Sequence, residues 1–138
     1  MTHLDTSFLV DLMREAARGV EGAATAFLDA LGDEEVGVSV HVLCELEAGA
    51  RLSAHPTREI AKIRRACSLL HVAYPDERFA PTYGRLLAEV HSTRRTVATM
   101  DLLIATAAIL AGATLVTENV KHFEPIAGLT LRTHKASK

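Results

Sequence analysis

Residues 100–117 read MDLLIATAAILAGATLVT, and this stretch decides the fold. Its apolar run from Leu102 to Val116 is shorter than the roughly 20 residues that a membrane span needs, and a glycine interrupts it. We therefore interpret it as a buried helix over 100–111 followed by a buried strand over 114–117. One acid, Asp101, lies inside this apolar run, and a carboxylate in such surroundings needs a partner.

Outward from this stretch, short apolar runs alternate with longer helical ones, a pattern typical of an α/β domain with a parallel sheet. The predicted strands are about His3–Asp5, Val36–Ser39, His71–Ala73, Thr114–Thr117 and Leu129–Arg132. The predicted helices are about Thr6–Arg18 with Thr6 and Ser7 as caps, Ala23–Leu31, His41–Leu52, Pro56–Leu69, Asp76–Ser92, Met100–Ala111 and a short turn or helix at Val120–Phe123. We expect one three-layer domain over residues 1–138, with four to five short strands between helices and a frayed tail after Thr133.

Composition and cysteine usage favour a soluble cytoplasmic protein. The chain has 138 residues, of which 49% are hydrophobic, so a real core is expected and disorder is not. We see no secretion signal and no membrane span. Cys44 and Cys67 form no metal-spaced pair and fit reduced, partly buried thiols. A net charge of −2 does not indicate nucleic-acid binding, which would need local basic patches.

Polar side chains at strand-to-helix junctions are the candidate site. Asp5 ends the first predicted strand, Glu45 lies on the helix after the second, and Asp101 and Asn119 flank the fourth. Because the carboxyl ends of parallel strands line one crevice, we expect these groups to meet there. Three carboxylates brought together repel one another, and a hard cation such as Mg²⁺ or Mn²⁺ resolves that conflict. Singly, each acid could equally be a helix cap or a solvated surface group.

Four blocks of sequence carry a family resemblance. They are LDTSFLVDL at 4–12, CELEAGA at 44–50, MDLLIATAAILAGATLVT at 100–117 and TENVKHF at 117–123. In this order and spacing they resemble PIN-domain nucleases, and specifically VapC-type toxins, over nearly the whole chain. The resemblance implies a three-layer PIN-like α/β fold and hydrolysis of RNA by metal-activated water. It also implies that the chain is the toxin of a type II toxin–antitoxin system.

The resemblance assigns roles to individual residues. Asp5, Glu45 and Asp101 would be the ligands of a Mg²⁺ or Mn²⁺ ion, and Asn119 completes the catalytic set. The hydroxyls that would support these ligands belong to Thr6, Ser7 and Thr117. Because Asn119 is neutral, we expect one firmly bound ion, while a weak second ion and the choice between a one-metal and a two-metal mechanism stay open. Of the neighbouring residues, Asp11 is expected to pair with its neighbours, Glu118 could approach the ion, and His122 is expected to pack or cap locally.

The resemblance also implies partners: an RNA substrate such as tRNA or ribosomal RNA, a cognate antitoxin that inserts a basic side chain among the acids, and a second copy in a homodimer. Basic residues that could steer RNA are Arg14, Arg18, Arg94, Arg95 and Lys121. A second basic patch, which also fits a solvated helix face, comprises Arg58, Lys62, Arg64 and Arg65. The antitoxin groove could be lined by Ala23, Ala24, Ala26, Phe27 and Ala30, or these residues could be ordinary core.

Two alternatives stay beside this interpretation. A phosphoacceptor receiver domain shares the α/β layout, but it needs an acidic pair after the first strand and a lysine after a later one. Only Asp5 follows the first strand here, and Thr117 and its neighbours supply no such lysine. A catalytically inactive PIN-like scaffold that binds RNA or protein is the second alternative, and the presence of all three acids argues against it.

Overall fold

The computed structural model describes residues 1–135 and has one parallel sheet of five strands in the order β3-β2-β1-β4-β5. Every neighbouring pair of strands is parallel. The strands are β1 Thr2–Leu4, β2 Val36–Ser39, β3 His71–Ala73, β4 Thr114–Val116 and β5 Leu131–Arg132. The predicted α/β class, the parallel sheet and its flanking helices are confirmed.

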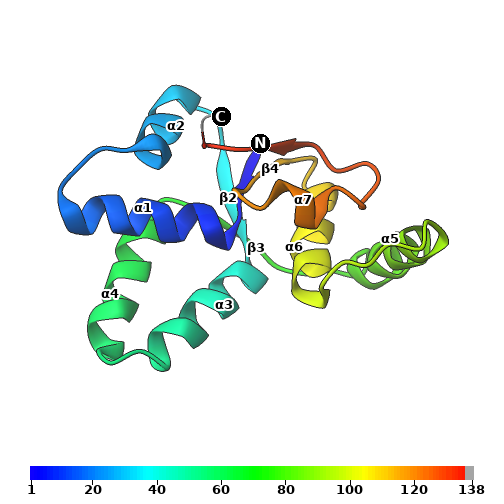
Figure 1. The fold of residues 1–138 in the computed structure, drawn as a ribbon, viewed down its shortest axis with the longest axis horizontal. Coiled ribbons are helices and arrows are strands. Elements are labelled where there is room, and N and C mark those ends of the chain that lie inside the picture. The colour runs from blue at the N-terminus through cyan, green and yellow to red at the C-terminus, as the bar shows by residue number, and fades with distance from the viewer. Residues whose placement is uncertain (136–138) are drawn as a thin grey trace.

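Helices cover both faces of the sheet. Figure 1 shows α1, α2 and α4 on one side of the strands and α5, α6 and α7 on the other, and neighbouring helices within each group are in contact. The helices are α1 Thr6–Arg18, α2 Ala23–Leu31, α3 Val40–Arg51, α4 Pro56–Cys67, α5 Phe79–Ser92, α6 Thr99–Leu110 and α7 Val120–Phe123. Within residues 1–135, no helix is long and apolar enough to cross a membrane.

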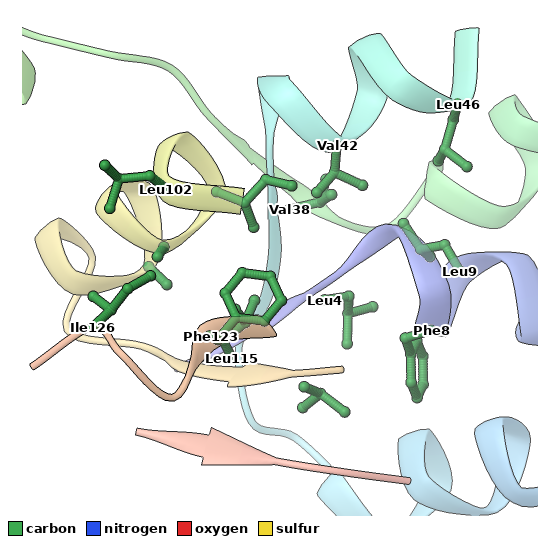
Figure 2. Close-up of a cluster of buried hydrophobic side chains, with 14 of the residues drawn as sticks. Leu4, Phe8, Leu9, Val38, Val42, Leu46, Leu102, Leu115, Phe123 and Ile126 are labelled. Carbon is green, nitrogen blue, oxygen red and sulfur yellow. The ribbon is translucent and has the colours of Figure 1, made fainter. Parts of the chain in front are cut away.

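One hydrophobic core joins the helical layers through the sheet. Leu4 and Leu115 contribute from neighbouring strands, and Figure 2 shows Phe8 of α1, Val42 of α3 and Leu102 of α6 in the same cluster. All five side chains are almost completely buried. Helix α6 is apolar around most of its circumference, because it packs against both α5 and the sheet. This core fixes the strand ends from which the candidate site is built.

The first helix begins differently from the prediction. Strand β1 ends at Leu4, and Asp5 takes the N-cap position of α1, but its carboxylate makes no capping hydrogen bond. Thr6 and Ser7 therefore lie inside the helix rather than before it, and the prediction that they cap it was wrong. Their hydroxyls instead contact acidic side chains, since Thr6 donates to Glu45 and Ser7 donates to Asp5. Asp5 therefore does not act as a helix cap, the usual role of an aspartate after a strand.

Three element boundaries differ from the prediction by two residues or more. Helix α5 begins at Phe79 rather than Asp76, because the Asp76 carboxylate accepts hydrogen bonds from the backbone and guanidinium of Arg78 and forms a turn. Pro81 then falls in the first helical turn, where a missing N–H costs little. Strand β5 is shorter than predicted because its pairing with β4 begins only at Leu131. Helix α4 ends at Cys67, two residues early.

The predicted fraying after Thr133 was wrong for the residues that follow it directly. His134 is only 8% exposed, and its ring packs edge-on against Phe8 with the ring centroids 4.8 Å apart. The remainder of the predicted tail, 136–138, lies outside the described residues.

The two cysteines also differ from each other, since Cys44 is exposed and Cys67 is half-buried. Cys44 is therefore not the partly buried residue that we expected.

Candidate active site

Asp5 is the most tightly held of the candidate acids. Its side chain is buried, and its backbone N–H donates to the carbonyl of Val116 at 3.0 Å, which ties the end of β1 to the end of β4. Thr117 Oγ1 donates to Asp5 Oδ2 at 2.7 Å, and Ser7 Oγ donates to the same oxygen at 3.1 Å. These donors stabilise a charged carboxylate in a buried position and fix its orientation.

Glu45 approaches from the second strand–helix unit. Ser39 caps α3 by accepting the N–H of Val42, so the helix starts directly after β2 and carries Glu45 in its second turn. The Glu45 carboxylate accepts a hydrogen bond from Thr6 Oγ1 at 2.6 Å. Because Thr6 directly follows Asp5 in the chain, this bond ties the second acid to the segment that carries the first.

Asp101 lies in the first turn of α6 with its side chain 24% exposed. Burial raises the pKa of Asp101, and the negative charges of Asp5 and Glu45 raise this pKa further, while His122 acts in the opposite direction. The fold therefore brings the three predicted acids close enough to act on one another electrostatically. His122 Nδ1 lies 4.0 Å from Asp101 Oδ2 on an exposed side chain, so it neither packs nor caps as we had expected.

The donor set fits a hard divalent cation. It consists of carboxylate oxygens, which are the ligands that such ions prefer, and the negative charges of Asp5 and Glu45 raise the pKa of Asp101. Within residues 1–135, Asp5, Glu45 and Asp101 are not a group whose ligand atoms all lie within 4.8 Å of one another. Mg²⁺ in proteins is commonly bound through one or two carboxylates and keeps several waters.

The segment 117–119 supports the site mainly through Thr117. This residue is fully buried, and its hydroxyl also accepts the backbone N–H of Asn119 at 3.0 Å. Ser7 Oγ accepts the backbone N–H of Glu118 at 3.1 Å. Asn119 itself is exposed at the N-cap of α7, without a side-chain cap bond, so the structure ties its backbone rather than its amide to the acids. The Glu118 side chain binds Lys135 at 3.6 Å.

The basic residues that were predicted to steer RNA are all exposed, as steering of an anionic substrate requires. Arg14 lines a groove of about 310 Å³ that also contains Thr6 and Glu45, so this groove opens onto the candidate site. The second basic patch is partly neutralised, since Lys62 pairs with Glu59 and Arg64 pairs with Glu47. Its interpretation as a solvated helix face is therefore the better one.

An apolar groove lies beside α2, the helix that we named as one possible wall of an antitoxin groove. Ala24 is buried in the core, whereas a mostly apolar groove of about 470 Å³ runs between α1 and α4. Its apolar lining includes Leu12, Met13, Ala17 and Val20, while α2 contributes Thr25. The alanines of α2 are thus divided between core and surface, so both interpretations of this helix, antitoxin groove and ordinary core, stay open.

Sequence reasoning missed one cluster beside the site. Asp11, Glu118 and His134 place their ligand atoms within 4.8 Å of one another, and Lys135 binds both acids. Asp11 does pair with Arg14 at 3.8 Å, as expected, but its closer partner is His134 at 2.8 Å. Nothing in the polar residues after Thr133 signals this contact, because it depends on β5 carrying the chain back over α1.

The fold and these acids define the class of protein. The PIN domain family matches residues 3–129, and the chain belongs to this family. It is 34% identical over 124 residues to "Ribonuclease VapC19" of Mycobacterium tuberculosis, covering 89% of this chain and 92% of that protein. It is 33% identical over 99 residues to the "tRNA(fMet)-specific endonuclease VapC" of Shigella flexneri, covering 72% and 75%.

A solved structure of VapBC2 from Rickettsia felis, bound to a DNA fragment from its promoter, shares the fold with a TM-score of 0.87. The sequences are 28% identical, and the match covers 96% of this chain and 97% of that one. The family resemblance that the four sequence blocks indicated is therefore confirmed.

Proposed function

We propose that this chain is a metal-dependent ribonuclease and the toxin of a toxin–antitoxin pair, working as a single domain. The observation that carries the proposal is that Thr6 links Glu45 of α3 to the segment of Asp5, and that the charges of Asp5 and Glu45 act on Asp101 of α6. The VapC ribonucleases among its relatives support the same activity. The presence of all three acids favours an active enzyme over an inactive PIN-like scaffold.

In this proposal each residue of the site has a separate task. Asp5, Glu45 and Asp101 would hold Mg²⁺ or Mn²⁺, which when bound neutralises phosphodiester charge and lowers the pKa of a coordinated water. Thr117 and Ser7 keep Asp5 in place, and Thr6 keeps Glu45 in place. Asn119, the fourth residue of the predicted catalytic set, would contribute from the rim of the site, where it is exposed.

The proposed substrate is a structured RNA such as tRNA or ribosomal RNA. The site is acidic, so the approach of the RNA would depend on the exposed basic residues that were predicted to steer it. With aromatic residues at only 4% of the chain, recognition would use RNA shape and backbone more than base stacking. Since such RNA is cytoplasmic, we expect the protein to act there. We further propose a homodimer, as the family resemblance implies.

The proposed protein partner is a cognate antitoxin. VapBC complexes among the similar structures support such a partner. A basic side chain placed among Asp5, Glu45 and Asp101 would satisfy these carboxylates and exclude the cation. Growth arrest on expression of this chain, relieved by the product of a short reading frame upstream of its gene, would support the pairing.

The ribonuclease proposal is tested by incubating the purified protein with a panel of tRNA and ribosomal RNA in Mg²⁺ or Mn²⁺. Wild type should cleave at least one RNA, and a chelator should abolish cleavage. Asp5→Asn and Asp101→Asn should each reduce the rate by roughly 100-fold or more, because each removes a charged ligand. Arg85→Ala, in an exposed ion pair of α5, is the control and should cleave normally.

Cleavage that persists unchanged in both acid variants would overturn the ribonuclease assignment. RNA binding by wild type without cleavage in either metal would instead favour the inactive scaffold.

A further inference from the structure

The last described residues form a buried contact close to the candidate site. The His134 side chain has no solvent exposure, and its Nε2 lies 2.8 Å from Asp11 Oδ2. Its ring packs against Phe8, the residue after Ser7 in α1. A histidine that packs against an aromatic ring and hydrogen-bonds a carboxylate fixes the direction in which the chain leaves β5.

Lys135 then joins two acids that would otherwise repel one another. Its Nζ lies 3.1 Å from Asp11 Oδ2 and 3.6 Å from Glu118 Oε2. Burial raises the pKa of Asp11, but hydrogen bonds from His134 and Lys135 outweigh this effect and hold the pKa below its ordinary value. Asp11 is therefore charged, and the ammonium group of Lys135 bridges α1 to the segment that follows β4.

That segment holds Asp5 by two routes. The Glu118 backbone N–H donates to Ser7 Oγ at 3.1 Å, and Ser7 Oγ donates to Asp5 Oδ2. The Thr117 backbone N–H donates to the carbonyl of Arg132 in β5 at 3.0 Å, and Thr117 Oγ1 donates to Asp5 Oδ2. Both hydroxyls that orient Asp5 are thus positioned by groups that the C-terminal contact holds.

We propose that His134 and Lys135 form a C-terminal latch, a pair of positioning residues that fix Asp5 for cation binding without touching it. The latch acts by holding Asp11 and Glu118 together, which immobilises the 117–119 segment. This inference rests on the proposed function, because it assigns a role toward the cation of the same site. Since Lys135 already lies between the two carboxylates, the Asp11–Glu118–His134 group serves as the latch rather than as a second cation site.

The test measures Mn²⁺ binding to the full chain by electron paramagnetic resonance, alongside the thermal unfolding midpoint. Lys135→Met and His134→Ala should each weaken Mn²⁺ binding about tenfold, the lower end of what loss of an outer-shell partner causes. Lys135→Arg should restore wild-type affinity, because it keeps the charge. Arg85→Met, which breaks a surface ion pair in α5, is the matched control and should bind as wild type does.

A purely structural role would lower the unfolding midpoint while leaving the Mn²⁺ dissociation constant of the folded protein unchanged. A constant within twofold of wild type in Lys135→Met would therefore overturn the latch. Lys135 is half-exposed, so this variant tests the proposal even where His134→Ala does not fold. The Asp5→Asn variant separates the two proposals. If Asp5→Asn binds Mn²⁺ as tightly as wild type, the proposed cation site is wrong, and the latch that depends on it is wrong as well.

Discussion

At the scale of single residues, the candidate site depends on the Asp5 carboxylate, which does not cap helix α1. An aspartate directly after a strand commonly caps the next helix with its carboxylate, and Asp5 takes that position without forming the bond. Two hydroxyls, from Ser7 and Thr117, hold its Oδ2 instead. The acids were predicted from their positions at strand–helix junctions and from the family resemblance, whereas their supporting hydroxyls were predicted from the resemblance alone. The sequence could not predict which hydroxyl serves which acid, since Thr117 meets Asp5 across 112 positions of sequence.

A buried hydroxyl with this role can be removed with little change of shape. Thr117→Val should keep the fold but lower the Mn²⁺ affinity and the RNA cleavage rate by about 10- to 100-fold, because Asp5 loses its shorter hydrogen bond. Thr106→Val is the matched control: Thr106 is equally buried, but within residues 1–135 its hydroxyl hydrogen-bonds only the Leu102 carbonyl of its own helix. Equal metal affinity in the two variants would show that the Thr117 hydroxyl does not orient Asp5.

At the scale of elements, one helix caps another. Helix α2 begins after Gly22 without a side-chain cap of its own. Glu15 of α1 supplies the cap, because its carboxylate accepts the backbone N–H groups of Gly22, Ala24 and Thr25 at 2.7–3.0 Å. A side chain at position 22 would place its Cβ 2.7 Å from Glu15 Cδ, so it would displace the carboxylate that forms this cap. Sequence patterns predicted both helices but not this cap, since capping rules examine only residues next to the helix start.

The cap from Glu15 makes the stability of the α1–α2 pair depend on pH. Burial raises the pKa of Glu15, but the hydrogen bonds from Thr25, Ala24 and Gly22 outweigh it and lower the pKa to about 2. Because the folded-state pKa lies below the ordinary value of 4.5, this stabilisation is complete above pH 4.5 and is lost as the pH falls toward 2. Glu15→Gln should therefore cost about 1 kcal/mol in urea unfolding at pH 7 and progressively less toward pH 2.

Glu21→Gln is the control for this prediction, because it removes a charge from the same connection at an exposed side chain. A Glu15→Gln penalty that stays constant from pH 7 to pH 2 would show that the Glu15 charge does not support the cap.

At the scale of the whole molecule, the predicted architecture follows from alternation of strand-like and helix-like runs, which is a local property of the chain. Contacts between segments that lie far apart in the chain cannot be predicted from such a local property. His134 returns to α1 only because β5 pairs with β4 at the edge of the sheet. The polar residues next to His134 in the sequence show no hydrophobic periodicity from which this contact could be predicted. The start of α5 was mispredicted for a different and local reason, because a turn at Asp76 replaced the predicted cap.

Strand β1 contains a buried histidine, His3, which affects the stability of the whole fold. His3 of β1 pairs in register with Gly37 of β2, which pairs with His71 of β3, so all three lie in one row on one face. The His3 ring occupies the space over Gly37, where a Cβ would lie 3.1 Å from its Cδ2 and Nε2. Within residues 1–135, both ring nitrogens of His3 are buried without a hydrogen-bond partner. Such a ring resists protonation in the folded state.

Acid should therefore destabilise the whole fold in a window set by His3. Burial lowers the pKa of His3 to about 4, with further lowering by His71 and the N-terminal amine, against an ordinary value of 6.5. Between these values the unfolded chain binds a proton that the folded chain refuses, so stability falls as the pH drops from 6.5 to 4, by up to about 3 kcal/mol. His3→Leu should remove this loss in urea unfolding at pH 7 and pH 5, whereas the exposed-site control His55→Leu should retain it. Since the Glu15 cap fails only below pH 4.5, a stability loss at pH 5 that persists in His3→Leu would assign acid sensitivity to another group.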